Sequence, residues 1–327
     1  MKEMNTKTNT RVEDILGIKY PIIQAPMNWL TNAEFVTAVS EAGGLGVLGF
    51  NAGLLAKDET VSIEEKLRSE IREIRKLTAK PFGMNLYSPQ EGMEKDNVYI
   101  SSTLDVAFEE EVKIFVVVGE VNRAFFKEIK NRGGIIIFRE LTPSVVSAKI
   151  AEDSGVDIIV ATGYDEGGHI PQRQIGTFSI VPAIVDAVDI PVLAAGGIND
   201  IRGVRAAFAL GAKGVFVGTR FIVSEENPAS EEAKQDIINS KSEDLLLVSG
   251  LQRSTPTKSA VELAQMYKSG RSTGEVEQEI NKRGGLRIGM LDGEVSKGII
   301  SVNTAIDTIK EKKTVKGIID ELMADFQ

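Results

Sequence analysis

The chain of 327 residues contains no cysteine, one histidine and one tryptophan. The absence of cysteine excludes disulfides, thiolate metal sites and a cysteine nucleophile. A zinc site is not expected either, because the single histidine has no second histidine or cysteine with which to share the metal. We therefore expect no metal centre in this chain.

Long apolar runs and a basic surface are also missing. No stretch approaches the roughly 18 apolar residues of a membrane-spanning helix, and residues 1–6 lack the apolar core of a signal peptide. The net charge is −9, the pI is about 5.0, and the lysines and arginines are scattered, which disfavours nucleic-acid binding. These absences predict a cytoplasmic protein that binds neither a membrane nor a nucleic acid.

Short apolar runs alternate with amphipathic segments along residues 15–225. Eight runs have the character of buried parallel strands, and helix-like stretches lie between them. Eight such units in about 220 residues predict an α/β fold of the TIM (β/α)8 barrel type, and an open doubly wound sheet is the alternative. The predicted strands are 20–25, 45–50, 81–87, 113–119, 135–141, 157–163, 191–197 and 214–220, and the predicted helices are 32–43, 60–77, 98–111, 122–132, 143–154, 177–188 and 200–211.

Two segments flank the predicted barrel. Residues 1–14 are predicted to be a polar N-terminal tail, and residues 226–327 a mainly helical and more charged extension. Two interpretations of the extension stay open: a solvated appendage that closes the eighth unit, and a lid over the barrel mouth. Within it we predict helices over 230–239, 259–269 and 314–325 and a glycine-rich loop over 283–289, and packing of the last helix on the barrel is left open.

Glycines end the seventh and eighth predicted strands. Gly196 and Gly197 follow one strand, and Gly218 and Thr219 follow the next. In barrels of this type, phosphate often binds after these two strands, where backbone N–H groups and a helix N-terminus approach its oxygens. Thr219 adds a hydroxyl donor. The two strand ends together predict a phosphate-binding site.

The single histidine, His169, follows Gly167 and Gly168 just beyond the sixth predicted strand. Its unperturbed pKa lies near neutrality, so it suits proton transfer. A lone histidine is more often an ordinary surface or core residue. The strand end and the two glycines, which let a ligand come close, favour a catalytic role for His169.

Strands one and three also end in candidate ligand contacts. Ala25, Pro26 and Met27 end the first predicted strand. Met27 either fills the core or presents its backbone and thioether to a flat ring. Asn85 lies in the third predicted strand and is either a turn residue or a hydrogen-bond partner for a polar ligand.

In their order and spacing, these segments resemble the flavin-dependent family of nitronate monooxygenases, formerly called 2-nitropropane dioxygenases. The same family includes the flavin type of enoyl-acyl-carrier-protein reductase (type II). The resemblance is strong over residues 15–225. The matching segments are Pro21-Ile22-Ile23-Gln24-Ala25-Pro26-Met27, Glu41-Ala42-Gly43-Gly44-Leu45-Gly46, Pro81-Phe82-Gly83-Met84-Asn85, Glu166-Gly167-Gly168-His169, Ile190-Pro191-Val192-Leu193-Ala194-Ala195-Gly196-Gly197-Ile198 and Val217-Gly218-Thr219-Arg220-Phe221.

This resemblance implies FMN bound at the barrel mouth. It assigns the FMN phosphate to Gly196, Gly197, Gly218 and Thr219, and the catalytic role to His169. The remaining cofactor contacts that it implies, along the ribityl chain and ring, are Ala25, Pro26, Met27, Asn85, Gly167 and Gly168.

The local patterns divide between the two chemistries of the family. Residues 24–27 and 176–182 resemble the monooxygenases, whereas Trp29 and residues 143–145 resemble the reductases. Near the C-terminus, Asn303-Thr304 replaces a glycine–glutamine pair of the family pattern, which puts the local lid or flavin contacts in doubt.

We predict a monooxygenase that converts alkyl nitronates and O₂ into a carbonyl compound and nitrite. One alternative is a reductase that uses FMN and NAD(P)H on an enoyl thioester carried by acyl carrier protein. The other is a non-catalytic barrel that binds a phosphate ligand. A homodimer stays open for all three.

Overall fold

Eight parallel strands form one sheet in the computed structural model, which describes residues 10–53 and 60–326. Each strand pairs with its neighbours along the chain, and β1 (Ile22–Gln24) also pairs with β8 (Gly214–Val217). The circle closes between β1 and Leu45, just before β2 (Gly46–Leu48): the Leu45 N–H donates to the Ile22 carbonyl (2.9 Å), and the Gln24 N–H donates to the Leu45 carbonyl (3.0 Å). The predicted TIM barrel is therefore confirmed, and the open sheet is excluded.

The observed elements follow the predicted order, and most bounds differ by only a few residues. Strand eight ends earlier than predicted, because helix α9 begins at Thr219. The other barrel strands are β3 (Phe82–Tyr87), β4 (Ile114–Gly119), β5 (Ile135–Glu140), β6 (Ile158–Thr162) and β7 (Val192–Ala195). The helices between the strands are α2 (Ala33–Glu41), α3 (Ile63–Leu77), α4 (Glu94–Glu109), α5 (Arg123–Asn131), α6 (Val145–Glu152), α7 (Thr177–Ala187) and α8 (Ile201–Ala209).

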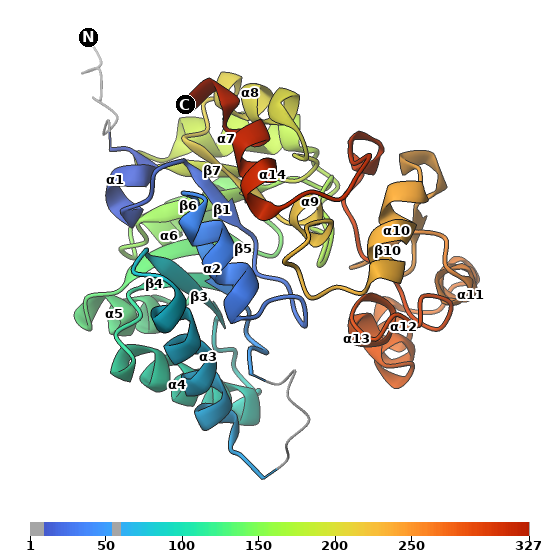
Figure 1. Ribbon diagram of the computed structural model, residues 1–327, viewed down its shortest axis with the longest axis horizontal. Coiled ribbons are helices and arrows are strands. Elements are labelled where there is room, and N and C mark those ends of the chain that lie inside the picture. The colour runs from blue at the N-terminus through green and yellow to red at the C-terminus, as the bar shows by residue number, and fades with distance from the viewer. Residues whose placement is uncertain (1–9, 54–59, 327) are drawn as a thin grey trace.

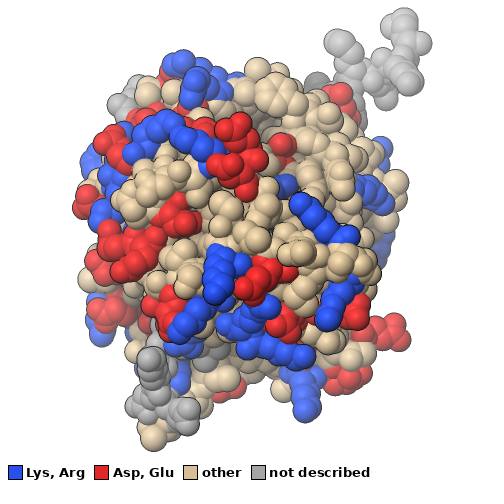
Figure 2. Space-filling view, turned by 90° about the vertical axis from the view of Figure 1, so that its right-hand side faces the viewer, with Lys and Arg blue, Asp and Glu red and all other residues tan. Residues whose placement is uncertain are grey.

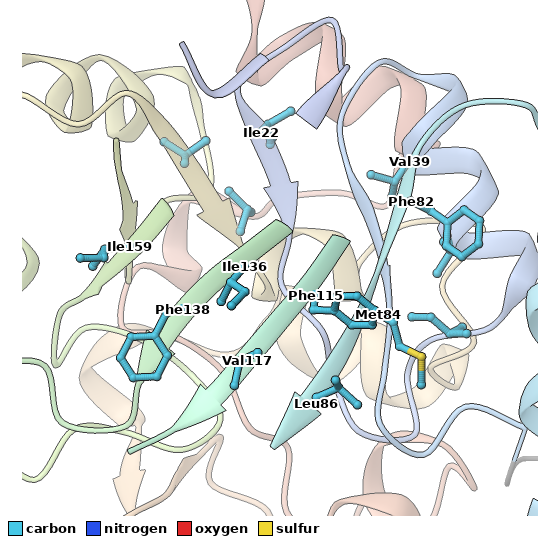
Figure 3. Close-up of a cluster of buried hydrophobic side chains, with 14 of the residues drawn as sticks. Ile22, Val39, Phe82, Met84, Leu86, Phe115, Val117, Ile136, Phe138 and Ile159 are labelled. Atoms are coloured by element: carbon cyan, nitrogen blue, oxygen red, sulfur yellow. The ribbon is translucent and has the colours of Figure 1, made fainter. Parts of the chain in front are cut away.

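Alternate side chains of each strand enter two different apolar layers. On β4 and β5, the outward-facing Phe115, Val117, Ile136 and Phe138 pack beneath the surrounding helices (Figure 3). The intervening residues, such as Ile137, fill the barrel interior. This alternation follows from the two-residue side-chain period of a strand, and it explains why the strands have nearly continuous apolar sequences.

A short helix, α1 (Val12–Leu16), precedes β1 and packs into the barrel interior. Val12 and Leu16 are both buried there. The helix begins within the segment predicted to be a polar tail, because two apolar residues four positions apart give it one buried face.

The chain leaves the barrel after α9 (Thr219–Ile222) and returns to it at α14 (Val315–Leu322). We call residues 223–314 the insertion; it lies to one side of the barrel (Figure 1). Helix α14 packs against α2 and α8, and its apolar side chains join the outer layer of the barrel core. It thus occupies the place of the eighth barrel helix. The insertion contains α10 (Glu231–Asn239), η1 (Ser242–Asp244), β9 (Leu246–Leu247), β10 (Arg253–Ser254), α11 (Lys258–Lys268), α12 (Thr273–Lys282), α13 (Gly285–Met290) and η2 (Ile306–Thr308).

Two features of the insertion differ from expectation. Helix α12 was not predicted, although Ser272 and Glu275 form a capping box at its start. Residues 283–289, predicted as a loop, contain most of helix α13. Gly284 and Gly285 have positive φ values and make the sharp turn that precedes this helix.

Acidic and basic side chains are interspersed over the face of the molecule that includes the insertion (Figure 2). Within the described ranges, no helix is both long enough and apolar enough to cross a membrane.

Candidate active site at the carboxyl ends of the strands

A cavity of about 330 Å³ opens at the carboxyl ends of the barrel strands. Side chains from the insertion, including Leu286 and Met290 of α13, form part of its wall. The structure brings every predicted site residue to this one cavity: Ala25, Pro26, Met27, Asn85, Gly167, Gly168, His169, Gly196, Gly197, Gly218 and Thr219.

Glycines follow β7 and β8 at the cavity, where the backbone conformation and close packing restrict side chains. Gly196 and Gly197 both have positive φ values, 105° and 71°, which side-chain-bearing residues rarely adopt. Gly218 precedes α9 and offers no side chain to cap its first turn. The Thr219 hydroxyl accepts a hydrogen bond from the Asn303 N–H (3.0 Å), so its own proton is left to donate.

The loop from Gly163 to Ile170 is fixed against the insertion. A methyl group on Gly167 would lie 2.6 Å from the carbonyl carbon of Val302, so only glycine fits there. The Gly168 N–H donates to the Ser301 hydroxyl (2.8 Å), and the space beside its α-carbon is open. His169 therefore follows one glycine that is pressed against the protein and a second that is open.

Asp165 and Glu166, the two carboxylates before His169, have different roles. The Asp165 carboxylate accepts a hydrogen bond from the Thr177 N–H (2.6 Å) and so satisfies a free donor at the start of α7. Glu166 lines the cavity and pairs with Arg139 of β5. The Nη2 group of Arg139 donates to Glu166 Oε1 (2.5 Å) and to the His169 carbonyl (2.9 Å).

Burial moves the pKa values of Glu166 and His169 in opposite directions. It raises the pKa of Glu166 to about 7, against the opposing charges of Arg139 and Arg253. Burial and, to a smaller extent, the charge of Arg139 together lower the pKa of His169 to about 4. At neutral pH the imidazole is therefore uncharged, while the carboxyl of Glu166 is close to its titration midpoint.

The ends of β1 and β3 form the opposite wall. Met27 packs at the boundary between the barrel core and the insertion. The Asn85 side-chain N–H₂ donates to the Val116 carbonyl (2.9 Å), which leaves its oxygen for a ligand. Asn85 is therefore a buried strand residue at the cavity and not a turn asparagine.

Several polar residues around the cavity were not identified from the sequence. Arg253 of β10 donates to the carbonyls of Tyr164 (3.0 Å) and Glu166 (2.5 Å). The side chains of Asn303 and Asn199 exchange two hydrogen bonds (2.7 and 2.9 Å). Only Asn303 gave a signal, as a departure from the family pattern. Arg139 could have been found as the one charged residue in the apolar run 135–139, whereas Arg253 lies in a short segment without any periodic pattern.

The fold and the cavity define a class: (β/α)8-barrel proteins whose site is built at the carboxyl ends of the strands. Residues 9–325 match the family model described as nitronate monooxygenase. The chain belongs to this family, and it is therefore an oxidoreductase.

Three related proteins illustrate the range of the family and its fold. A probable nitronate monooxygenase of Staphylococcus haemolyticus is 36% identical over 73% of this chain and 74% of its own length. The structure of FabK from Thermotoga maritima is 32% identical, covers 98% of this chain and 96% of its own, and superposes with a TM-score of 0.83. The nitroalkane oxidase of Streptomyces ansochromogenes shares the fold at 22% identity, with a TM-score of 0.77 over 94% of this chain and 96% of its own.

Proposed function

We propose that the protein binds FMN in this cavity and oxidises alkyl nitronates with O₂ to a carbonyl compound and nitrite. The observation that carries the proposal is the placement of His169, uncharged at neutral pH, in the same cavity as the glycine ends of β7 and β8. Family membership favours this oxidoreductase over a non-catalytic phosphate-binding barrel.

The residues of the cavity fit FMN. Gly196, Gly197 and Gly218 would hold the phosphate through backbone groups, with the hydroxyl of Thr219 as a further donor. The side-chain oxygen of Asn85 accepts no hydrogen bond from the described residues and is not fully buried, so it can accept one from a ligand. Bound FMN would supply the electron transfer from substrate and the reaction with O₂.

The protein itself handles the proton and the orientation. A neutral nitroalkane must lose a proton from the carbon next to its nitro group to become a nitronate. The uncharged imidazole of His169 would accept that proton. With a nitronate supplied as such, the same ring would only orient the substrate oxygens, so the two substrates depend on His169 to different degrees.

His169→Asn provides the first test. We expect turnover of neutral nitroethane to fall by about 10²–10⁴-fold, the range for loss of a general base, and turnover of ethylnitronate to fall much less. Oxygen uptake measures both rates, and the flavin spectrum shows whether FMN stays bound. Gln172→Ala, an exposed residue on the same loop, is the control. Unchanged nitroethane turnover in His169→Asn would remove histidine from the mechanism.

A second candidate is an enoyl-acyl-carrier-protein reductase that uses FMN and NAD(P)H. It is favoured by the similarity to FabK, an enoyl-acyl-carrier-protein reductase II, along nearly the whole chain, including the insertion. Anaerobic mixing separates the two candidates. Rapid bleaching of the flavin by NADH, with turnover of crotonyl thioester, selects the reductase, whereas nitronate-dependent oxygen uptake without NADH selects the monooxygenase.

A further inference from the structure

Arg139 is a cation placed inside the barrel. On β5 it shares the inward face with Ile135 and Ile137, where other strands bring apolar side chains. Its residue exposure is 7%, and it is the only lysine or arginine among the described residues that line the cavity. Burial of a charge is costly unless the charge is paired and hydrogen-bonded. The groups around Arg139 should therefore show how its buried charge is compensated.

The protein uses only one edge of the guanidinium. A guanidinium has five N–H donors, and both protein contacts, to Glu166 Oε1 and the His169 carbonyl, come from Nη2. Nε and Nη1 donate to none of the described residues, neither atom is fully buried, and Arg139 lines the cavity. Because a bidentate pair with Glu166 is not formed, an edge of the planar fork remains for a ligand.

The partner of Arg139 can lose its charge. The carboxyl of Glu166 faces Arg139 of β5 and lies near Arg253 of β10, and its loop neighbours are Asp165 and the uncharged His169. Its pKa is raised to about 7, chiefly by burial. Protonation of Glu166 near neutral pH would leave the positive charge of Arg139 uncompensated at the cavity wall.

We propose that Arg139 binds a planar two-oxygen anion on the substrate, and that Glu166 takes up a proton when this anion binds. The anion replaces the carboxylate of Glu166 as the counter-charge of the guanidinium, and the proton removes the repulsion between the two anions. The substrate role of this site rests on the proposed function. The anion site itself does not, because it can be measured without turnover.

Propionate and propionamide are matched probes, since they have nearly the same shape and differ in charge. Titration calorimetry of the whole protein, as isolated, in two buffers of different ionisation enthalpy counts the protons taken up. We expect propionate to bind with proton uptake above pH 7, and its affinity to fall by up to tenfold for each further pH unit. Propionamide should bind, if at all, without proton uptake or pH dependence.

Two variants separate the roles of the pair. Glu166→Gln should bind propionate with no linked proton and an affinity that is constant above pH 7. Arg139→Met should lose propionate binding, and Arg139→Lys should recover part of it. The double variant Arg139→Met/Glu166→Gln leaves no unpaired charge, and it replaces the single variant if that variant fails to fold.

Propionate binding that survives Arg139→Met, or that takes up no proton in the unmodified protein, would overturn the proposal. These outcomes are independent of nitronate oxidation. A protein that binds propionate as expected but oxidises no nitronate would refute the proposed function and leave the anion site standing.

Discussion

The barrel buries one extensive outer apolar layer and a much smaller inner one, whereas the insertion contributes to two small clusters and meets the barrel partly through polar groups. The barrel layers follow from repeating strand and helix patterns. The polar contacts of the insertion come from isolated residues such as Arg253, Ser301 and Asn303, and they end on the loop after β6 and on the start of α9. The barrel therefore provides the strand ends, and the insertion fixes the loops that follow them.

The largest expected effect is a difference between matched core substitutions. Ile71 of α3 lies in the outer layer of the barrel, and Ile280 of α12 lies in a small cluster of the insertion; both are buried. We expect Ile71→Ala to lower the free energy of unfolding by about 4 kcal/mol and Ile280→Ala by about 2 kcal/mol, because a small cluster collapses more readily around the lost volume. Urea unfolding measures both, and equal losses would show that the two regions pack alike.

A smaller loss of stability is expected when a polar contact between the insertion and the barrel is removed. Arg253→Met removes the hydrogen bonds to the Tyr164 and Glu166 carbonyls, and it should lower the free energy of unfolding by about 2–3 kcal/mol. Hydrogen exchange at the Gly167 and Gly168 amides should also become faster, since the loop loses an anchor.

Arg202→Met is the matched control for Arg253→Met, because it also replaces an arginine by methionine. Arg202 pairs with Asp200 on the surface, its side chain is 75% exposed, and its loss should leave the free energy of unfolding nearly unchanged. Similar losses of stability in the two variants, without faster exchange in the loop, would contradict the anchoring role of Arg253.

The same contrast explains which features the sequence could predict. The barrel, the glycine strand ends and the place of His169 follow from short-range patterns, because parallel strands bring their carboxyl ends together wherever such patterns recur. The partners of the loop could not be predicted. Ser301 lies 133 residues from Gly168, and Arg253 lies 87 residues from Glu166. No local pattern links residues so far apart, so these contacts depend on how the insertion folds back.

The smallest expected effect is a pair of opposite pH dependences within the loop itself. The folded protein binds the proton of Glu166 up to pH about 7, whereas an unfolded glutamate releases it near pH ~4.3. This carboxyl therefore contributes stability that is full below the unfolded pKa and is lost as the pH rises towards 7. His169 acts in the opposite sense: its pKa is lowered to about 4, so its contribution grows as the pH rises from 4 towards ~6.5.

Between pH 5 and 6 the two contributions nearly cancel. A variant that lacks one of the two groups should therefore show the pH dependence of the remaining group alone. Relative to the unmodified protein, Glu166→Gln should gain stability with rising pH and His169→Asn should lose it, each by at most about 1.4 kcal/mol per pH unit. The double variant should run parallel to the unmodified protein. Urea unfolding at about pH 5.0, 5.5 and 6.0 measures how the free energy of unfolding of each variant changes with pH. A Glu166→Gln variant that also runs parallel would mean that the folded protein releases the Glu166 proton at the ordinary pKa, and the counter-charge of Arg139 would then be permanent.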